Sequence, residues 1–340
     1  MRIAIVGVGS LGTIIGALIT KAGVEIDLID KDIEQVRALR ENGARVTGQM
    51  NLTTPVKAFT PDEIIGKYDL ILYLVKATHD HEALPFIYDH LEEDGFVLTM
   101  QNGMPEERIA KFIGPERIMG CAVGWGATLV RPGISRMTSE VHRMTYDVGE
   151  IDGSDSERLQ RVIDLLSLAG QAYKTFNLIG LRWSKLLFNA PFNGTSTIIG
   201  GTYGDVLLNH KALLCAAHIM REALIVARAA NIHLQVIQEF NFNVFNFNNK
   251  KELIERLPLY GIFYGPHRDI KASMLYDIEK GEPCEIDAIN GVISAWARKY
   301  RVETPVNDQV VETIKAIENG SIKPGPAVFN QITIPVLPEE

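Results

Sequence analysis

The chain has 340 residues, which predicts about two domains because single cores rarely grow beyond roughly 250–300 residues. Hydrophobic residues make up 46% of it and charged residues 22%, which excludes a disordered chain. With 34 Lys and Arg against 42 Asp and Glu, the net charge of −8 argues against nucleic acid or a membrane surface as a partner.

Cysteine usage points to a reducing compartment. The three cysteines lie far apart and show no CxxC spacing, so the sequence suggests neither a disulfide framework nor a zinc site. The eight histidines form no metal-binding pattern, and we expect no metal. We therefore expect a cytoplasmic protein.

The first part of the chain, residues 1–176, alternates short apolar runs with amphipathic stretches, as βαβ units of a parallel sheet do. The uncharged run Ile3–Thr20 contains four glycines, so we expect a strand and a turn there, not a membrane span or a signal peptide. The expected strands are Arg2–Val8, Glu25–Asp30, Asp69–Val75, Phe96–Met100 and Ile118–Val123. The expected crossover helices are Gly12–Ala22, Ile33–Glu41, His79–Leu91 and Pro105–Phe112.

The second part, residues 177–323, is expected to be a helical domain, because strand-like runs give way to a 3.6-residue period. An Asn- and Phe-rich stretch, Phe240–Asn249, is assigned to one of these helices with its Phe residues buried. Residues 324–340 contain four prolines and are expected to form an extended tail. The expected helices are Leu178–Phe192, Lys211–Ala230, Leu234–Leu257, Ile270–Lys280, Glu285–Tyr300 and Val306–Asn319.

A glycine-rich motif, GVGSLG, directly follows the first expected strand and opens the first helix. In that context Gly7 permits a tight turn, Gly9 lets the backbone approach a diphosphate, and Gly12 allows the helix to pack on the strand. The diphosphate would lie at the helix N-terminus, where free N–H groups point at it, and Ser10 and Leu11 of the motif belong to the same cofactor-binding loop. The motif predicts a Rossmann-type dinucleotide-binding domain with a doubly wound parallel sheet.

Further polar residues follow other strands, where ligands bind in open α/β sheets. Asp30 ends the second strand and would accept hydrogen bonds from the adenosine ribose, which favours NADH. Lys31 beside it could instead attract the 2′-phosphate of NADPH. Lys76 and Asn102 follow the next two strands and would border the cofactor. The alternatives are a solvated turn at Asp30 and Lys31, a solvated helix-capping lysine at Lys76, and an ordinary Asn-Gly turn at Asn102.

The helical domain offers a proton donor. Lys185, Asn189 and Asn193 are spaced i, i+4, i+8 along an otherwise apolar helix, so they share one face. Polar groups in such a stretch need partners or a function, although a solvated stripe is the alternative. Because a ketone that accepts a hydride needs a proton, Lys185 is the candidate general acid.

Two residues farther along the chain complete the candidate site. Glu285 shares an apolar helical face with Ile289 and Val292, whereas Asp287 points elsewhere. A carboxylate that points inward needs a hydrogen-bond donor, which indicates a functional role. The alternative is that Glu285 is simply stabilised by the dipole at the helix N-terminus. For Ser273, the alternative is a helix cap.

Taken together, the chain resembles the ketopantoate reductases, also called 2-dehydropantoate 2-reductases. The matching motifs occur in family order across nearly the whole chain. They are GVGSLG, LVKA at Lys76, QNGM at Asn102, RWSKLLFNAPFN, SMLYDIEKG, CEIDAINGVI and TPVN at Thr304–Asn307.

This resemblance implies NADPH-dependent reduction of a 2-keto acid, ketopantoate, in pantothenate biosynthesis, with a homodimer as a possible assembly. It implies Lys185 as general acid and Glu285 as the residue that engages the substrate hydroxyl. By the same resemblance Asn102, Asn189, Asn193 and Ser273 contact the substrate, and Lys76 lies near the nicotinamide ribose. The glycine-rich loop would bind the dinucleotide.

Two departures from the family pattern bear on specificity. Asp30-Lys31 stands where an arginine often binds the 2′-phosphate, and Gly194 stands where a bulkier residue is common. Two other enzymatic functions therefore stay possible: a dehydrogenase for another branched 2-hydroxy acid, or a dehydrogenase for an opine-type product. A non-catalytic dinucleotide sensor is a third alternative, although it would not need Lys185 or Glu285.

Overall fold

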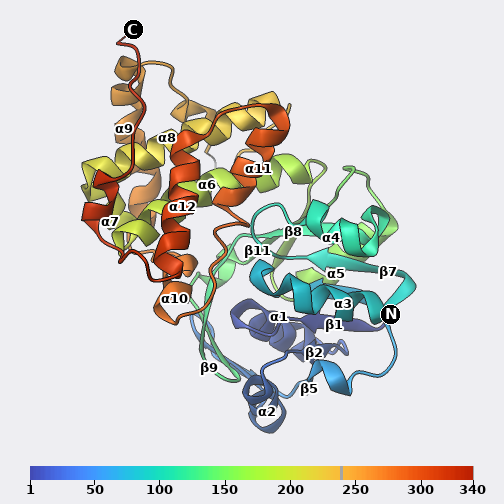
Figure 1. The fold of residues 1–340 in the computed structure, drawn as a ribbon. Helices are drawn as coiled ribbons and strands as arrows, with labels where there is room; N and C mark the ends of the chain where they lie inside the picture. The colour runs from blue at the N-terminus through green and yellow to red at the C-terminus, as the bar shows by residue number, and fades with distance from the viewer. Residues whose placement is uncertain (238–239, 340) are drawn as a thin grey trace. The chain divides into compact units, whose positions relative to one another are not determined.

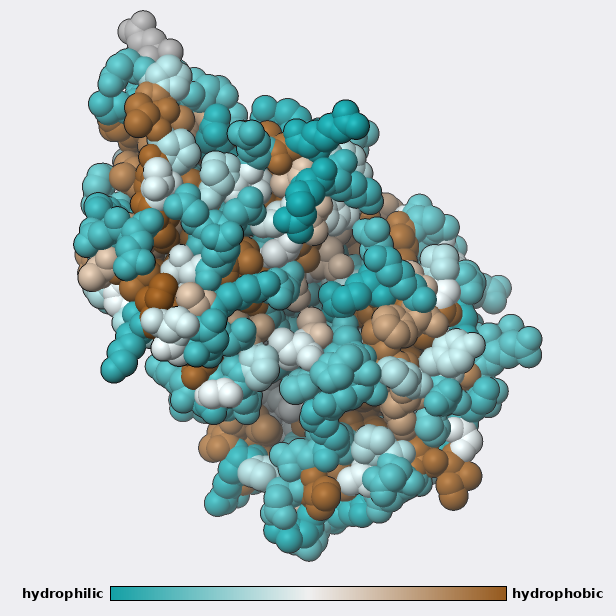
Figure 2. All heavy atoms as spheres, in the orientation of Figure 1, coloured by the Kyte–Doolittle hydropathy of each residue, from teal (hydrophilic) through white to brown (hydrophobic). Residues whose placement is uncertain are grey.

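The computed structural model describes residues 1–237 and 240–339, which form two compact units (Figure 1). The first unit is Met1–Leu178, and the second begins at Ile179. On the face drawn in Figure 2, hydrophilic side chains predominate and apolar ones are scattered among them. Among the described residues, none of the helices combines the length and the apolar character needed to cross a membrane.

An eight-stranded sheet forms the centre of the first unit, in the order β12-β11-β8-β7-β6-β1-β2-β5. The six strands from β8 to β5 run parallel, β11 pairs antiparallel with β8, and β12 runs parallel to β11. The strands are β1 (Ile3–Val6), β2 (Asp27–Ile29), β5 (Lys57–Phe59), β6 (Tyr68–Tyr73), β7 (Leu91–Thr99), β8 (Ile118–Val123), β11 (Thr145–Glu150) and β12 (Gln171–Lys174).

Helices cover both faces of this sheet. Ile5 of β1 belongs to one buried cluster, with residues of α1 (Ser10–Lys21), α2 (Ile33–Asn42) and α5 (Glu157–Ser167). Its neighbour Ala4 belongs to the other cluster, with residues of α3 (Asp80–Asp89) and α4 (Glu106–Ile113). Successive strand residues point to opposite faces, so each face has its own core. The expected doubly wound sheet, its five strands and its four crossover helices are confirmed.

The sequence analysis did not predict the strands β5, β11 and β12 of the large sheet, the helix α5 or a second sheet. This four-stranded sheet has the order β4-β3-β10-β9. Its strands are short and half-exposed, and β3 pairs with a strand almost ninety positions later in the chain, so no local apolar run marks it. The strands are β3 (Ala44–Gly48), β4 (Leu52–Thr54), β9 (Ala127–Arg131) and β10 (Ile134–Met137).

A buried amide joins this second sheet to the glycine-rich loop. The Gln35 side chain, on α2, donates from Nε2 to the Val8 carbonyl at 2.6 Å. Its Oε1 accepts the N–H of Gly133 at 2.7 Å, in the turn between β9 and β10. Gln35 is 1% exposed, so its amide has no access to water. These two hydrogen bonds satisfy the amide in place of water. Gln35 thereby connects the loop after β1 to the turn of the second sheet.

The second unit is helical, and its described residues outside helices form only isolated bridges. Its first helix is buried along most of its length, because apolar residues cover nearly all of its faces. The α-helices are α6 (Leu178–Ile199), α7 (Tyr203–Leu208), α8 (His210–Ala229), α9 (Lys250–Tyr264), α10 (Ser273–Glu279), α11 (Asn290–Tyr300) and α12 (Pro305–Glu318).

The predicted helix Leu234–Leu257 is wrong. Its described residues form a 3-10 helix at Phe242–Phe245, and α9 begins only at Lys250; residues 238 and 239 lie outside the described residues. Asparagine side chains explain the difference, because Asn241 caps the 3-10 helix and Asn249 caps α9. The expected burial holds in part, since Phe242, Phe245 and Phe247 are buried.

The C-terminal segment, expected to be an extended tail, contains one short helix, and its described residues from 331 to 339 form no helix or strand. Pro326–Asn330 forms a 3-10 helix whose Val328 and Phe329 are buried. Beyond it, the Lys250 N–H donates to the Pro338 carbonyl at 2.8 Å. The segment is therefore packed on the helical unit.

A buried carboxylate fastens α12. Glu222 of α8 is 3% exposed and accepts the N–H groups of Val306 at 2.9 Å and Asn307 at 2.8 Å, at the start of α12. Both donors are free because the first N–H groups of a helix have no partner within it. Burial nevertheless raises the pKa of the Glu222 carboxyl from 4.5 to about 7, although the two N–H groups oppose this shift.

This raised pKa predicts a pH-dependent stability. The folded state binds the Glu222 proton more tightly than the unfolded chain does, so this proton stabilises the fold. That contribution to the unfolding free energy is complete below about pH 4 and is lost as pH rises through about 7. Between pH 5 and 8, the wild type should lose about 2 to 3 kcal/mol of unfolding free energy relative to Glu222→Gln. Urea unfolding of both proteins across this range measures the difference, and parallel pH profiles would contradict the prediction.

Candidate functional site

The carboxyl ends of four neighbouring strands meet at one edge of the large sheet. The register pairs Val6 with Ile29 and with Tyr73, and Tyr73 with Thr99, so these residues form one row across β2, β1, β6 and β7. The residues that follow them along the chain therefore emerge at the same edge. They include the glycine-rich loop, Asp30, Lys76 and Asn102, all predicted from sequence for this edge.

The glycine-rich loop has the geometry that its motif predicts. Gly7 has φ +95°, and a Cβ there would lie 2.5 Å from the Val75 nitrogen. A Cβ on Gly12 would collide with the Gly7 carbonyl oxygen, whereas one on Gly9 would meet no atom within 4 Å. Ser10 and Leu11 form the first turn of α1, whose N-cap is Gly9. The open space beside Gly9 fits a diphosphate, which the free N–H groups of α1 would bind.

Asp30 holds this loop. Its carboxylate accepts the Val8 N–H at 2.7 Å and the Asp32 N–H at 3.0 Å. Burial raises the pKa of Asp30, and these hydrogen bonds oppose the shift. A carboxylate offers about four acceptor positions, so Asp30 retains capacity for a ribose hydroxyl. The solvated-turn alternative does not describe Asp30, which is half-buried.

For Lys31, the alternative of a solvated turn residue agrees with the structure. It is exposed, and its ammonium group forms an ion pair with Glu82 at 2.6 Å. Its Nζ also lies 3.4 Å from Nδ1 of His79. Burial and the Lys31 charge lower the pKa of His79. The Glu82 carboxylate therefore competes with any phosphate for the Lys31 charge.

Lys76 and Asn102 are both half-buried beside a polar cluster that the sequence analysis missed. Asp80 is 7% exposed and accepts the Tyr73 hydroxyl at 2.5 Å and the Arg108 Nε–H at 2.5 Å. Gln101 donates from Nε2 to Asp80 at 2.8 Å and to the Val75 carbonyl at 2.7 Å. These hydrogen bonds fix the residues that directly precede the two candidate side chains.

The missed cluster has a weak sequence signal. Asp80 lies in the first turn of α3, where an acidic residue is ordinary. Gln101 directly precedes Asn102, and an interior amide at a strand end could have suggested a network. The expected Asn-Gly turn is present, since Gly103 has φ +77°.

In the second unit, the polar stripe lies on one helix, as predicted. Lys185, Asn189 and Asn193 all belong to α6; the first two are half-buried, and Asn193 is 7% exposed. The Asn193 Oδ1 accepts a hydrogen bond from the buried Tyr203 hydroxyl. A solvated stripe is therefore excluded at Asn193.

Pro191 interrupts the hydrogen bonding of α6 beside this stripe. A proline has no N–H, so the Leu187 carbonyl lacks its usual helical donor. The buried Tyr264 hydroxyl lies 3.3 Å from that carbonyl oxygen and 3.1 Å from the carbonyl of Phe188, and it can donate to either. Its ring stacks on Phe192, with the ring centroids 3.6 Å apart. Tyr264 thereby keeps the helix continuous between Asn189 and Asn193.

Glu285 is buried as expected, at 7% exposure, but the reason differs from the prediction. It lies in a turn before α11, which begins at Asn290, so the predicted helix start at Glu285 is wrong. The turn is connected to α6, since the Asn290 Nδ2 donates to the Ala190 carbonyl at 3.1 Å. Asp287 is exposed and pairs with Lys315 at 2.7 Å, which agrees with its predicted outward direction.

Ser273 is exposed and is the first residue of α10. The helix-cap alternative is wrong, because the N-cap is Ala272 and no side chain caps this helix. The segment before α10 is also tied to the stripe: the Tyr203 N–H donates to the Ile270 carbonyl at 3.0 Å, and the Tyr203 hydroxyl donates to Asn193. Ser273 thus lies three residues from a direct partner of Tyr203.

Gly194 has a packing explanation. A Cβ at this position would lie 2.9 Å from a methyl carbon of Val310 and 3.4 Å from the Asn290 amide. Asn290 also exchanges hydrogen bonds with Asn307, whose Nδ2 donates to the Asn290 carbonyl at 3.0 Å. Gly194 therefore faces the contact with α11 and α12.

Comparison with known proteins gives consistent results over both units. A family model described as "Ketopantoate reductase PanE/ApbA" matches residues 3–152, and "Ketopantoate reductase PanE/ApbA C terminal" matches residues 177–318. The 2-dehydropantoate 2-reductase of Pyrococcus horikoshii is 28% identical over 321 residues, which cover 94% of this chain and 98% of the relative. The enzyme of the same name from Archaeoglobus fulgidus gives the same identity and coverage.

Solved structures agree on the fold. The ternary structure of D-mandelate dehydrogenase with NADH and anilino(oxo)acetate is 25% identical and has a TM-score of 0.79, covering 94% of this chain and 99% of that one. The 2-dehydropantoate 2-reductase of Geobacter metallireducens is 26% identical with a TM-score of 0.78, covering 93% of this chain and 99% of that one.

Proposed function

The chain belongs to the ketopantoate reductase family, and from this premise we propose that it reduces the ketone of ketopantoate with NADH or NADPH. The observation that carries the proposal is the Lys185–Asn193 stripe, which places a lysine and two amides on an apolar, largely buried helix. A spectrophotometric assay of nucleotide oxidation with ketopantoate tests it. An absence of ketopantoate turnover with both nucleotides would contradict it.

The residues of the first unit fit a bound nicotinamide dinucleotide, because a Cβ on Gly9 would meet no atom within 4 Å and Asp30 retains acceptor capacity. The nicotinamide ring of the bound nucleotide would supply the hydride to the substrate ketone. The glycine-rich loop would bind the diphosphate through the N–H groups of α1, and Lys76 and Asn102 would lie at the same sheet edge. The Asp80 cluster would hold both of these side chains in position.

The second unit would supply the proton and bind the substrate. Lys185 would donate a proton from Nζ to the keto oxygen as negative charge develops on it. Asn189 and Asn193 would hydrogen-bond the substrate, with Tyr203 and Tyr264 fixing the helix that carries them. The buried Glu285 carboxylate would accept the substrate hydroxyl, and Ser273 would contact the substrate carboxylate.

A second candidate function has its own support. D-mandelate dehydrogenase resembles this chain in structure as closely as the Geobacter reductase does, with TM-scores of 0.79 and 0.78. We therefore include a dehydrogenase for another 2-hydroxy acid. Comparing kcat/KM for ketopantoate with that for phenylglyoxylate, the keto acid of mandelate, separates the two functions.

The structure supports the predicted use of NADH at least as well as NADPH. Asp30 places a carboxylate at the second strand end, and the Lys31 charge is paired with Glu82. We expect Glu82→Gln to free Lys31 and to raise the NADPH/NADH ratio of kcat/KM several-fold. Steady-state kinetics with both nucleotides at one pH and one ionic strength measure this ratio.

A substitution at Asp30 should keep the hydrogen bond that its side chain accepts, which alanine does not. Because it accepts the Val8 N–H, Asp30→Ala would weaken the binding of both nucleotides as well as shift preference toward NADPH. Asp30→Asn keeps an acceptor while removing the charge, so its effect on preference can be read separately. A strong NADPH preference in the wild type would refute the assignment of Asp30 to the ribose.

Compartment, pathway and assembly belong to the same proposal. All three cysteines are free and buried, in keeping with a reducing cytoplasm. Ketopantoate reduction would place the enzyme in pantothenate biosynthesis. For the homodimer that the resemblance leaves possible, light scattering would give twice the chain mass of 37.7 kDa.

A further inference from the structure

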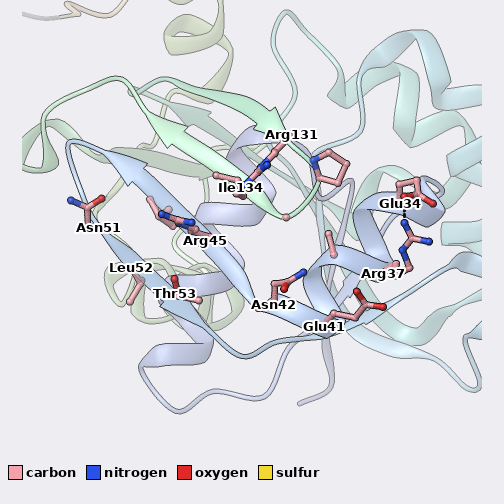
Figure 3. A pocket seen from close by; sticks show the side chains of 15 residues that line it. Glu34, Arg37, Glu41, Asn42, Arg45, Asn51, Leu52, Thr53, Arg131 and Ile134 are labelled. Carbon is pink, nitrogen blue, oxygen red and sulfur yellow. Dashed lines mark hydrogen bonds and ion pairs between the residues drawn. The ribbon is translucent and has the colours of Figure 1, made fainter.

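A polar pocket of about 890 Å³ lies between α2 and the four-stranded sheet of the first unit (Figure 3). Its volume is within the range of small-molecule sites. None of its lining residues belongs to the glycine-rich loop or to the other residues assigned to the reaction. The pocket is therefore separate from the site proposed for the nucleotide.

One row of paired residues crosses the sheet beneath this pocket. Thr53 pairs with Arg45, Arg45 pairs with Ile134, and Ile134 pairs with Arg131. All four line the pocket, and directly paired residues project from the same face of a sheet. Strands lie about 4.8 Å apart, so the Cα atoms of the two arginines are separated by about 10 Å. Figure 3 shows Ile134 between them.

Both guanidinium groups belong to exposed side chains. Within the described residues, neither the Arg45 nor the Arg131 side chain makes a hydrogen bond or an ion pair. The third arginine of the pocket, Arg37, is paired with Glu34 on α2. The remaining carboxylate, Glu41, lies at the other end of the pocket from Arg45 in Figure 3. The sheet side of the pocket therefore carries two uncompensated positive charges.

Two glycines let the backbone around the pocket pack closely. Gly43 has φ +73° and Gly133 has φ +74°, and both line the pocket. A Cβ on Gly43 would lie 2.6 Å from the Thr54 carbonyl oxygen, and one on Gly133 would lie 3.1 Å from the Cβ of Ala38. The N–H of Gly133 is bonded to the buried Gln35 amide. The backbone on either side of the pocket is therefore held by close contacts and by this hydrogen bond.

From these observations we infer that this pocket binds a small molecule with two anionic groups, carboxylate or phosphate, one at Arg45 and one at Arg131. The planar guanidinium fork matches both anion types through paired hydrogen bonds. The side chains of Asn42 and Asn51 line the same pocket and supply donors and acceptors for the uncharged part of the ligand.

Isothermal titration calorimetry of the full chain tests the inference, with citrate as the carboxylate probe and inorganic pyrophosphate as the phosphate probe. We expect saturable binding of at least one probe, and the stronger of the two identifies the anion class. The double variant Arg45→Gln/Arg131→Gln should weaken that binding about tenfold or more, since each substitution removes charge-assisted hydrogen bonds. Both side chains are exposed and unpaired, so the double variant should melt like the wild type.

The matched control is Arg161→Gln, an exposed arginine on α5 outside the pocket, which should bind the probe like the wild type. Binding unchanged in the double variant would place the anion elsewhere, for example at the glycine-rich loop, and would overturn the inference. Equal weakening in the double variant and in Arg161→Gln would show a general charge effect and would also overturn it. So would the absence of saturable binding for both probes.

Discussion

Replacing Lys185 with alanine should lower kcat by about 10²-fold or more and leave the dinucleotide Kd nearly unchanged. The physical reason is that reduction of a ketone places negative charge on its oxygen, and we propose the Lys185 ammonium group as the donor of the proton that this oxygen takes up. The residues that we propose to bind the nucleotide belong to the first unit, so the substitution should leave them unchanged. Steady-state kinetics combined with a fluorescence titration of the nucleotide measure both quantities.

Two further variants show whether Lys185 acts by its proton or by its charge. Lys185→Arg keeps the charge but holds its proton too tightly to donate it, so kcat should stay low while KM recovers. Lys250→Ala removes an exposed lysine that pairs with Glu339 on the surface, and it should behave like the wild type. A kcat near the wild-type value in Lys185→Ala would refute the assignment.

The second large effect is expected at Glu285. Glu285→Ala should raise KM for ketopantoate about tenfold or more, because a buried carboxylate that accepts a hydroxyl contributes a charge-assisted hydrogen bond. KM for 3,3-dimethyl-2-oxobutanoate, the same keto acid without its hydroxyl, should change little. The ratio of the two KM values is the measurement.

Folding controls accompany this comparison, since Glu285 is buried. Glu285→Gln keeps the shape and one acceptor and should give an intermediate KM for ketopantoate. Asp287→Ala, two residues away, removes an exposed carboxylate paired with Lys315 and should leave both KM values unchanged. If Glu285→Ala raised KM equally for both substrates, its role would be structural.

The sequence by itself determined the features that depend on local pattern. The strand, glycine-rich turn and helix at Gly7–Gly12 follow from residue types that only one backbone path accommodates, and the structure shows the steric reasons at Gly7 and Gly12. The shared face of Lys185, Asn189 and Asn193 follows from helical periodicity alone. The family motifs likewise stand in continuous stretches of sequence.

The tertiary structure alone decided the features built from distant residues. The second sheet pairs β3 with β10, and the Asp80 cluster joins two strand ends to two helices, so neither has a local signature. The start of α11 was misplaced because a turn with partial helical hydrogen bonding buries Glu285 as a helix would. The two unpaired arginines lie in one row across the sheet, on either side of Ile134, only through strand register, since 86 positions separate Arg45 from Arg131 in the chain. Long-range pairing depends on the summed packing of both partners, which no short stretch of sequence contains.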